Sequence, residues 1–115
     1  AFERGAEWFG RRGIYPMHSL LVVRDDVLAE RPGIANALYE ALSEGKRRYI
    51  ESIGNGTAVE KIDDRYRKQQ KVVGDPLPYG LEANRPTLEA LMGYAVQQKL
   101  IPKALPVEDL FVNLN

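Results

Sequence analysis

The sequence predicts an α/β fold in which helices surround one buried strand over about residues 17–24. The run from Met17 to Arg24 is rich in branched aliphatic side chains, which favours a strand at this length. Alternate positions are apolar on both of its faces, as in strands covered on both sides of a sheet. Elsewhere the apolar residues recur at helical spacing. A chain of 115 residues that is 44% hydrophobic is long enough for one modest core.

Four longer helices and two short turns are expected around this strand. They cover residues 2–10, a turn over 27–31, a helix from Pro32 to the GNG break at 54–56, a charged helix over 57–73, a helix over 85–98, and a last turn packing through Leu110 and Phe111. Thr57 and Glu60 have the spacing of a capping box. Asn84 is expected to cap the helix that begins near Arg85. The segment GDPLPYG at 74–80 interrupts any regular element.

Composition excludes several classes of function. Sixteen basic residues balance sixteen acidic ones, so no overall field attracts nucleic acid or an anionic membrane. The absence of cysteine excludes disulfides and thiolate metal sites. No phosphate-binding loop, clustered metal-ligand set or membrane-length apolar run occurs in the sequence. The residues alone therefore predict no metal site.

Two segments carry candidate site residues. His18 is the single histidine and stands at the head of the expected strand, two residues after Pro16. It is either a hydrogen-bonded structural histidine or a proton-transfer group, since ligand sites in α/β folds gather at strand ends. In PYGLEANR, residues 78–85, Arg85 offers a fork that can bind a carboxylate next to a helix N-terminus. A plain loop and helix start is the alternative for this segment.

Several stretches together resemble the C-terminal part of the 4,5-dihydroxyphthalate decarboxylase family. They are AEWFGRRGIYPMHSLLVVRDDVL, RPGIANALYEALSEGKR and GDPLPYGLEANRPTLEALMGYAVQQKLI followed by VEDLF. The sequence departs most from the family over 55–73, and Lys99 stands where a glycine is expected. The resemblance implies that residues 1–115 are the C-terminal part of a longer, two-lobed chain similar to type 2 periplasmic binding proteins, with ligand between the lobes.

The resemblance also implies a reaction, the non-oxidative loss of CO2 from a hydroxylated aromatic dicarboxylic acid. That acid would be the small-molecule partner, and the reaction requires no cofactor. His18 matches a family motif position and would move the proton. By chemical type, Arg24 or Arg85 could hold the retained carboxylate, and Tyr15 or Tyr79 could bond a ring hydroxyl. The alternative is a substrate-binding protein of an ABC-type uptake system that binds an aromatic or anionic solute without turnover. The enzyme would be cytoplasmic and the transport component periplasmic.

Overall fold

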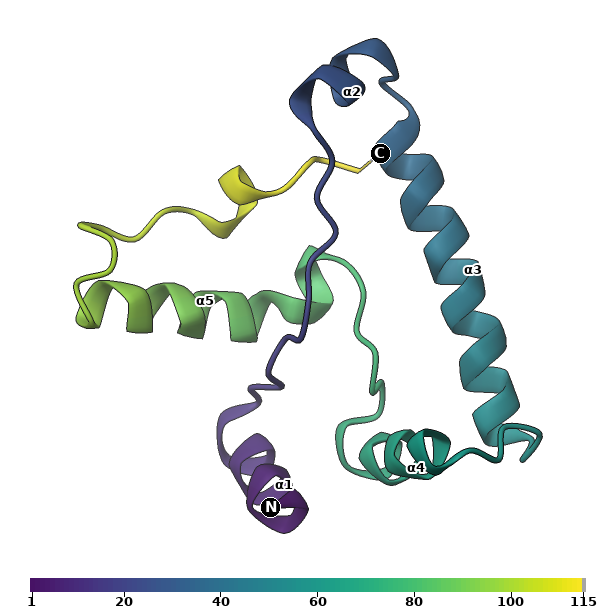
Figure 1. Ribbon diagram of the computed structural model, residues 1–115. Helices are drawn as coiled ribbons and strands as arrows, with labels where there is room; N and C mark the ends of the chain where they lie inside the picture. Colours follow the sequence, from purple (N-terminus) through teal and green to yellow (C-terminus); the bar gives the residue numbers. More distant parts are fainter. Residues whose placement is uncertain (115) are drawn as a thin grey trace. The chain divides into compact units, whose positions relative to one another are not determined.

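The computed structural model describes residues 1–114 and consists of helices joined by extended segments (Figure 1). The helices are α1 (Phe2–Arg12), α2 (Asp25–Glu30), α3 (Ile34–Gly54), α4 (Lys61–Val73), α5 (Leu81–Gln97) and the 3-10 helix η1 (Val107–Leu110). They form two compact units. Unit 1 combines residues 1–18 with 78–113, and unit 2 contains residues 19–77 and Leu114. None of the helices in this described part is long and apolar enough to cross a membrane.

The predicted α/β fold is wrong, because the described residues contain helices and no strand. The segment over 17–24 is extended, and Arg24 has the strand-like angles φ −65° and ψ 143°. No backbone hydrogen bond joins residues 17–23 to another described segment, so no sheet forms. Three of the side chains expected to be buried, Leu20, Leu21 and Val22, are instead 60%, 65% and 84% exposed, whereas Met17 and Val23 are half-buried. A branched aliphatic run thus favours the extended backbone but does not supply the neighbour that a strand requires.

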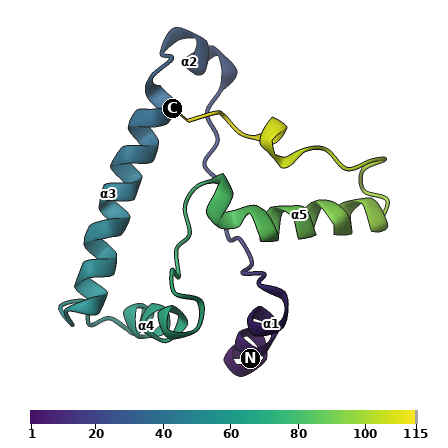
Figure 2. The same cartoon turned by 180° about the vertical axis from the view of Figure 1, so that it is seen from behind.

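In unit 1, η1 packs against α5. After α5 the chain reverses and runs back beside it, as Figures 1 and 2 show from opposite sides. Leu88 of α5 and Val107 of η1 are buried, with 6% and 5% exposure. Leu110, expected to pack, is 52% exposed, while Phe111 is half-buried. The helix α1 is confirmed. It ends at Gly13, whose φ of 65° lets its N–H reach the carbonyl of Phe9.

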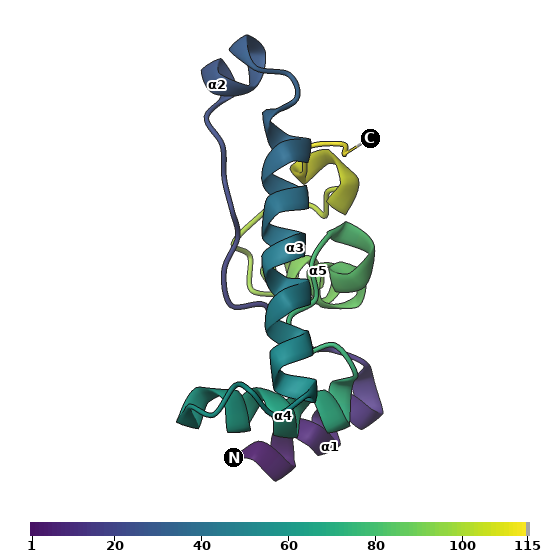
Figure 3. The same cartoon turned by 90° about the vertical axis from the view of Figure 1, so that its right-hand side faces the viewer.

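In unit 2, the end of α3 meets α4 at a corner (Figure 3). Ile53 is the most buried apolar side chain described, with 1% exposure. The rings of Tyr49 and Tyr66 meet edge to face with centroids 6.0 Å apart. The Tyr49 hydroxyl donates a hydrogen bond to the buried Asp63 carboxylate. Burial and then this bond raise the pKa of Tyr49 to about 12, and the same bond lowers the pKa of Asp63.

The capping box of α4 lies three residues later than predicted. Glu60 is the N-cap, and its side chain and that of Asp63 satisfy each other's backbone N–H groups. Thr57 instead donates its hydroxyl hydrogen bond to the side chain of Asn55, at 2.7 Å. Both possibilities have the same spacing in the sequence. The structure forms the capping box with Glu60 and Asp63 because the hydroxyl of Thr57 is already bonded to Asn55 in the turn after α3.

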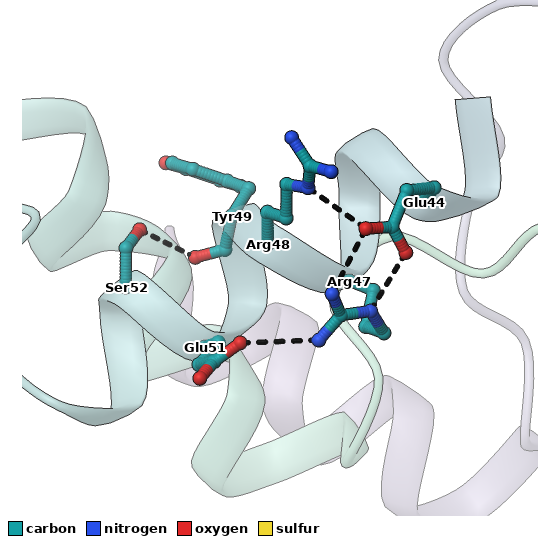
Figure 4. Close-up of polar contacts among 6 residues, drawn as sticks. All are labelled: Glu44, Arg47, Arg48, Tyr49, Glu51 and Ser52. Carbon is teal, nitrogen blue, oxygen red and sulfur yellow. Dashed lines mark hydrogen bonds and ion pairs between the residues drawn. The ribbon is translucent and has the colours of Figure 1, made fainter. Parts of the chain in front are cut away.

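The exposed surface of α3 carries an ion-pair network (Figure 4). Arg47 binds both oxygens of Glu44, at 2.7 and 2.9 Å, and reaches Glu51 at 3.2 Å. Arg48 donates to Glu44 at 2.8 Å. The two arginines hold the pKa of Glu44 down to about 2. These contacts at helical spacings support α3 locally, and because they are exposed, salt screens them.

Candidate functional site

Two hydrogen bonds join the segment before His18 to helix α5. The Thr87 hydroxyl accepts the backbone N–H of Tyr15 at 3.2 Å and donates to the Tyr15 carbonyl at 2.8 Å. A hydroxyl has the capacity for both roles, so one side chain satisfies both backbone groups of Tyr15. The ring of Tyr15 also meets Phe9 edge to face, with centroids 6.5 Å apart. We call these two hydrogen bonds the 15–87 junction. It fixes the chain three residues before His18.

The segment around Tyr79 is held by the side chain of Asn84. Helix α5 begins at Leu81, one turn before the predicted start. The Asn84 amide lies inside the helix and donates to the carbonyls of Pro78 and Gly80, both at 2.9 Å. The predicted N-cap role, in which the side chain accepts a backbone N–H, is therefore wrong. Asn84 is instead a donor that ties the preceding loop to the first turn.

Pro86 explains why the start of α5 was misplaced. Proline is typical of the first turn of a helix and disfavours helical geometry in the residue before it, so the sequence indicated a start near Arg85. In the structure Pro86 is the sixth residue of α5. Gly80 is the N-cap residue before the helix and has a φ of 89°, a region that glycine adopts without strain. Because proline has no N–H, the carbonyl of Glu82 lacks its usual donor four residues later.

Arg85 links α5 to η1 through carboxylates. Its guanidinium lies 2.7 Å from Glu82, 2.6 Å from Glu108 and 3.5 Å from Glu89. The hydrogen bond from Arg85 lowers the pKa of Glu82. A backbone N–H and then Arg85 lower the pKa of Glu108, and both carboxylates raise the pKa of Arg85. A substrate carboxylate at Arg85 would compete with these groups for the guanidinium. That predicted role stays a prediction.

Four of the five candidate residues belong to unit 1. Tyr15 and Arg85 are half-buried in the contacts described above, whereas His18 and Tyr79 are exposed. Arg24 belongs to unit 2, where its guanidinium forms two hydrogen bonds to Asp26 at 3.0 and 2.5 Å. The structure thus brings the two motif segments of unit 1 together and leaves Arg24 outside that unit.

Sequence reasoning missed Thr87 and Glu108. A threonine in the second turn of a helix gives no local sign that it binds a residue 72 positions earlier. Glu108 follows a proline-rich loop, and only the reversal of the chain after α5 brings it to Arg85.

Within the described residues, no group of three or more histidine, aspartate or glutamate side chains is arranged to hold a metal ion. No protein-family model matches the chain, and no curated protein is significantly similar to it. The resemblance to 4,5-dihydroxyphthalate decarboxylases therefore depends on the quoted segments alone.

Proposed function

We propose that this chain contributes to the binding and non-oxidative decarboxylation of a hydroxylated aromatic dicarboxylic acid, with His18 as the proton-transfer group. The single observation that supports this most is the 15–87 junction. It connects GIYPMH, residues 13–18, to PYGLEANRPT, residues 78–87, and these are two of the segments on which the resemblance depends. Residues far apart in the sequence but joined in space are what a shared ligand site requires.

The chemistry assigns His18 one step. The para oxygen, as a phenolate, pushes electron density onto the ring carbon that bears the leaving carboxylate, and the imidazolium N–H of His18 gives its proton to that carbon. The carbon–carbon bond to the carboxylate then breaks, its electron pair restores the aromatic ring and the phenolate, CO2 leaves, and the imidazole regains a proton from the solvent. A tyrosine hydroxyl from Tyr15 or Tyr79 bonds a ring hydroxyl. The retained carboxylate needs a cation, for which Arg24 or Arg85 is the candidate of suitable chemistry.

The exposure of His18 favours a second candidate function, solute binding for uptake without turnover. The charge that develops on the ring and on the departing carboxylate is stabilised most strongly where bulk water is excluded. An imidazole open to water can still donate a hydrogen bond to an anionic or aromatic solute. The same residues would then bind the ligand, and no CO2 would form.

The variant His18→Gln separates these functions. For the enzyme, CO2 release from 4,5-dihydroxyphthalate should fall by about 100-fold or more, the usual scale for the loss of a general acid, with little change in affinity. Ser19→Gln, an exposed neighbour, serves as the matched control and should behave as wild type. For the binding protein, calorimetry should show weaker ligand binding by His18→Gln, and wild type should release no CO2. If His18→Gln changes neither quantity, the imidazole is structural and His18 has neither of the proposed roles.

A further inference from the structure

Helix α4 presents four cations on one exposed face. Lys61, Arg65, Lys68 and Lys71 are all exposed, and we call them the basic stripe. At 3.6 residues per turn their positions fall within an arc of about 120° and extend over about 15 Å of the helix. The opposite face, with Tyr66, packs against α3. The basic stripe is thus a solvent-facing row on a helix whose other side contacts α3 through Tyr66.

No ion pair neutralises the basic stripe within the described part of the chain. Asp64 lies on the same face but pairs with Arg67, 2.5 Å away, and Asp63 is turned inward to Tyr49. The arginines of α3, in contrast, are paired with Glu44 and Glu51. Like charges three and four residues apart destabilise a helix, so the stripe costs α4 stability until an anion covers it.

We propose that the basic stripe is a docking surface for an acidic segment of a partner protein. The charges of the stripe select a row of carboxylates of matching length. At its N-terminal end, Val59 and Ile62 are 81% and 44% exposed. Apolar side chains next to a charged rim are typical of protein–protein interfaces. The partner segment therefore carries acidic residues along about 15 Å, or ten helical residues, and a bulky apolar residue at one end.

Other polyanions fit this surface less well. Binding of single-stranded nucleic acid uses exposed aromatic rings for base stacking, and the aromatic residue of α4, Tyr66, is packed against Tyr49. An interfacial membrane helix inserts a continuous apolar face, but the side of α4 opposite the stripe is interrupted by Gln69 and Gln70, and its Tyr66 packs against Tyr49. This inference goes beyond the proposed function and does not depend on it.

The probe is a labelled helical peptide with glutamates at i, i+4, i+7 and i+11 and a terminal leucine, measured by fluorescence anisotropy. A peptide of the same composition with scrambled spacing is its counterpart. The stripe variant is Arg65→Gln, Lys68→Gln and Lys71→Gln together. The matched control is Arg4→Gln, Arg31→Gln and Lys103→Gln, which removes the same charge from other exposed positions. Circular dichroism verifies that both variants are folded.

The stripe variant should bind the patterned peptide about tenfold more weakly than wild type, since each exposed pair contributes modestly, whereas the control variant should keep its affinity. A second variant, Val59→Ser with Ile62→Ser, keeps every charge and should also weaken binding several-fold. The proposal is overturned by equal losses in the stripe and control variants, by no preference for the patterned peptide, or by unaltered binding to the second variant. If oligothymidine, or vesicles with equal parts phosphatidylserine and phosphatidylcholine, bind more tightly than the patterned peptide at physiological salt, the assignment to a protein partner is also overturned.

Discussion

Replacing Thr87 by valine removes both hydrogen bonds of the 15–87 junction while keeping the shape and the branched Cβ. A neutral hydrogen bond contributes about 0.5–1.5 kcal/mol, and the half-buried Tyr15 backbone regains part of this from water, so Thr87→Val should cost unit 1 about 1–2 kcal/mol. With the urea slope typical of a small unit, the midpoint should fall by about 1 M. Trp8, the single tryptophan, lies in α1 of the same unit and reports its unfolding by fluorescence.

Thr87→Ser provides the control, because it keeps the hydroxyl and should lose much less stability than the valine variant. Thr57→Val removes a comparable hydroxyl in unit 2 and should leave the Trp8 transition in place. If Thr87→Val unfolds at the wild-type urea concentration, or Thr87→Ser loses as much stability as valine, the junction does not hold unit 1 together in the way described.

Two further predictions concern the side-chain amide of Asn84 and the carboxylate of Asp63. Asn84→Ala should destabilise unit 1 by about 1 kcal/mol, and Asn84→Asp, which lacks the amide donor, should cost a similar amount. Urea denaturation measures both losses. If Asn84→Asp keeps the wild-type stability, the side chain acts as an N-cap acceptor instead. The pKa of Asp63 is lowered from 3.8 by the hydrogen bond from Tyr49, so its contribution to stability is complete above about pH 4 and is lost as the pH falls further. Circular dichroism of Tyr49→Phe should show a weaker loss of unit 2 stability below pH 4 than wild type, and identical acid profiles would contradict this origin.

The helices could be predicted from the sequence more reliably than the contacts between them. The helix pattern is local, because apolar side chains at spacings of three and four residues report on one element alone. Accordingly the break at 54–56 and the end of α4 at Val73 agree with the structure. Helix ends were less certain, as Pro86 and Thr57 show, because two neighbouring arrangements satisfy the same local rule.

The predicted strand failed for a different reason. A strand is a relation between two segments, and residues 17–24 reveal only their own preference for extended backbone. In the candidate site, Tyr15 and Arg85 lie in the same unit because the Thr87 side chain binds the backbone of Tyr15. The ion pair of Arg85 with Glu108 forms because the chain reverses after α5. Neither is encoded in a short window of sequence. The chemical roles of His18, Tyr79 and Arg24 remain predictions.

The composition of unit 1 has a consequence for the order of folding during synthesis. Its two parts are separated by the continuous stretch that forms unit 2. As the chain leaves the ribosome, residues 19–77 can bring α3 and α4 together before Thr87 exists. Residues 1–18 must wait for α5, with the entropy cost of closing a loop of 72 residues. Helix α1 therefore emerges before unit 2 and is anchored after it, and Trp8 should acquire its native fluorescence only once α5 has been made.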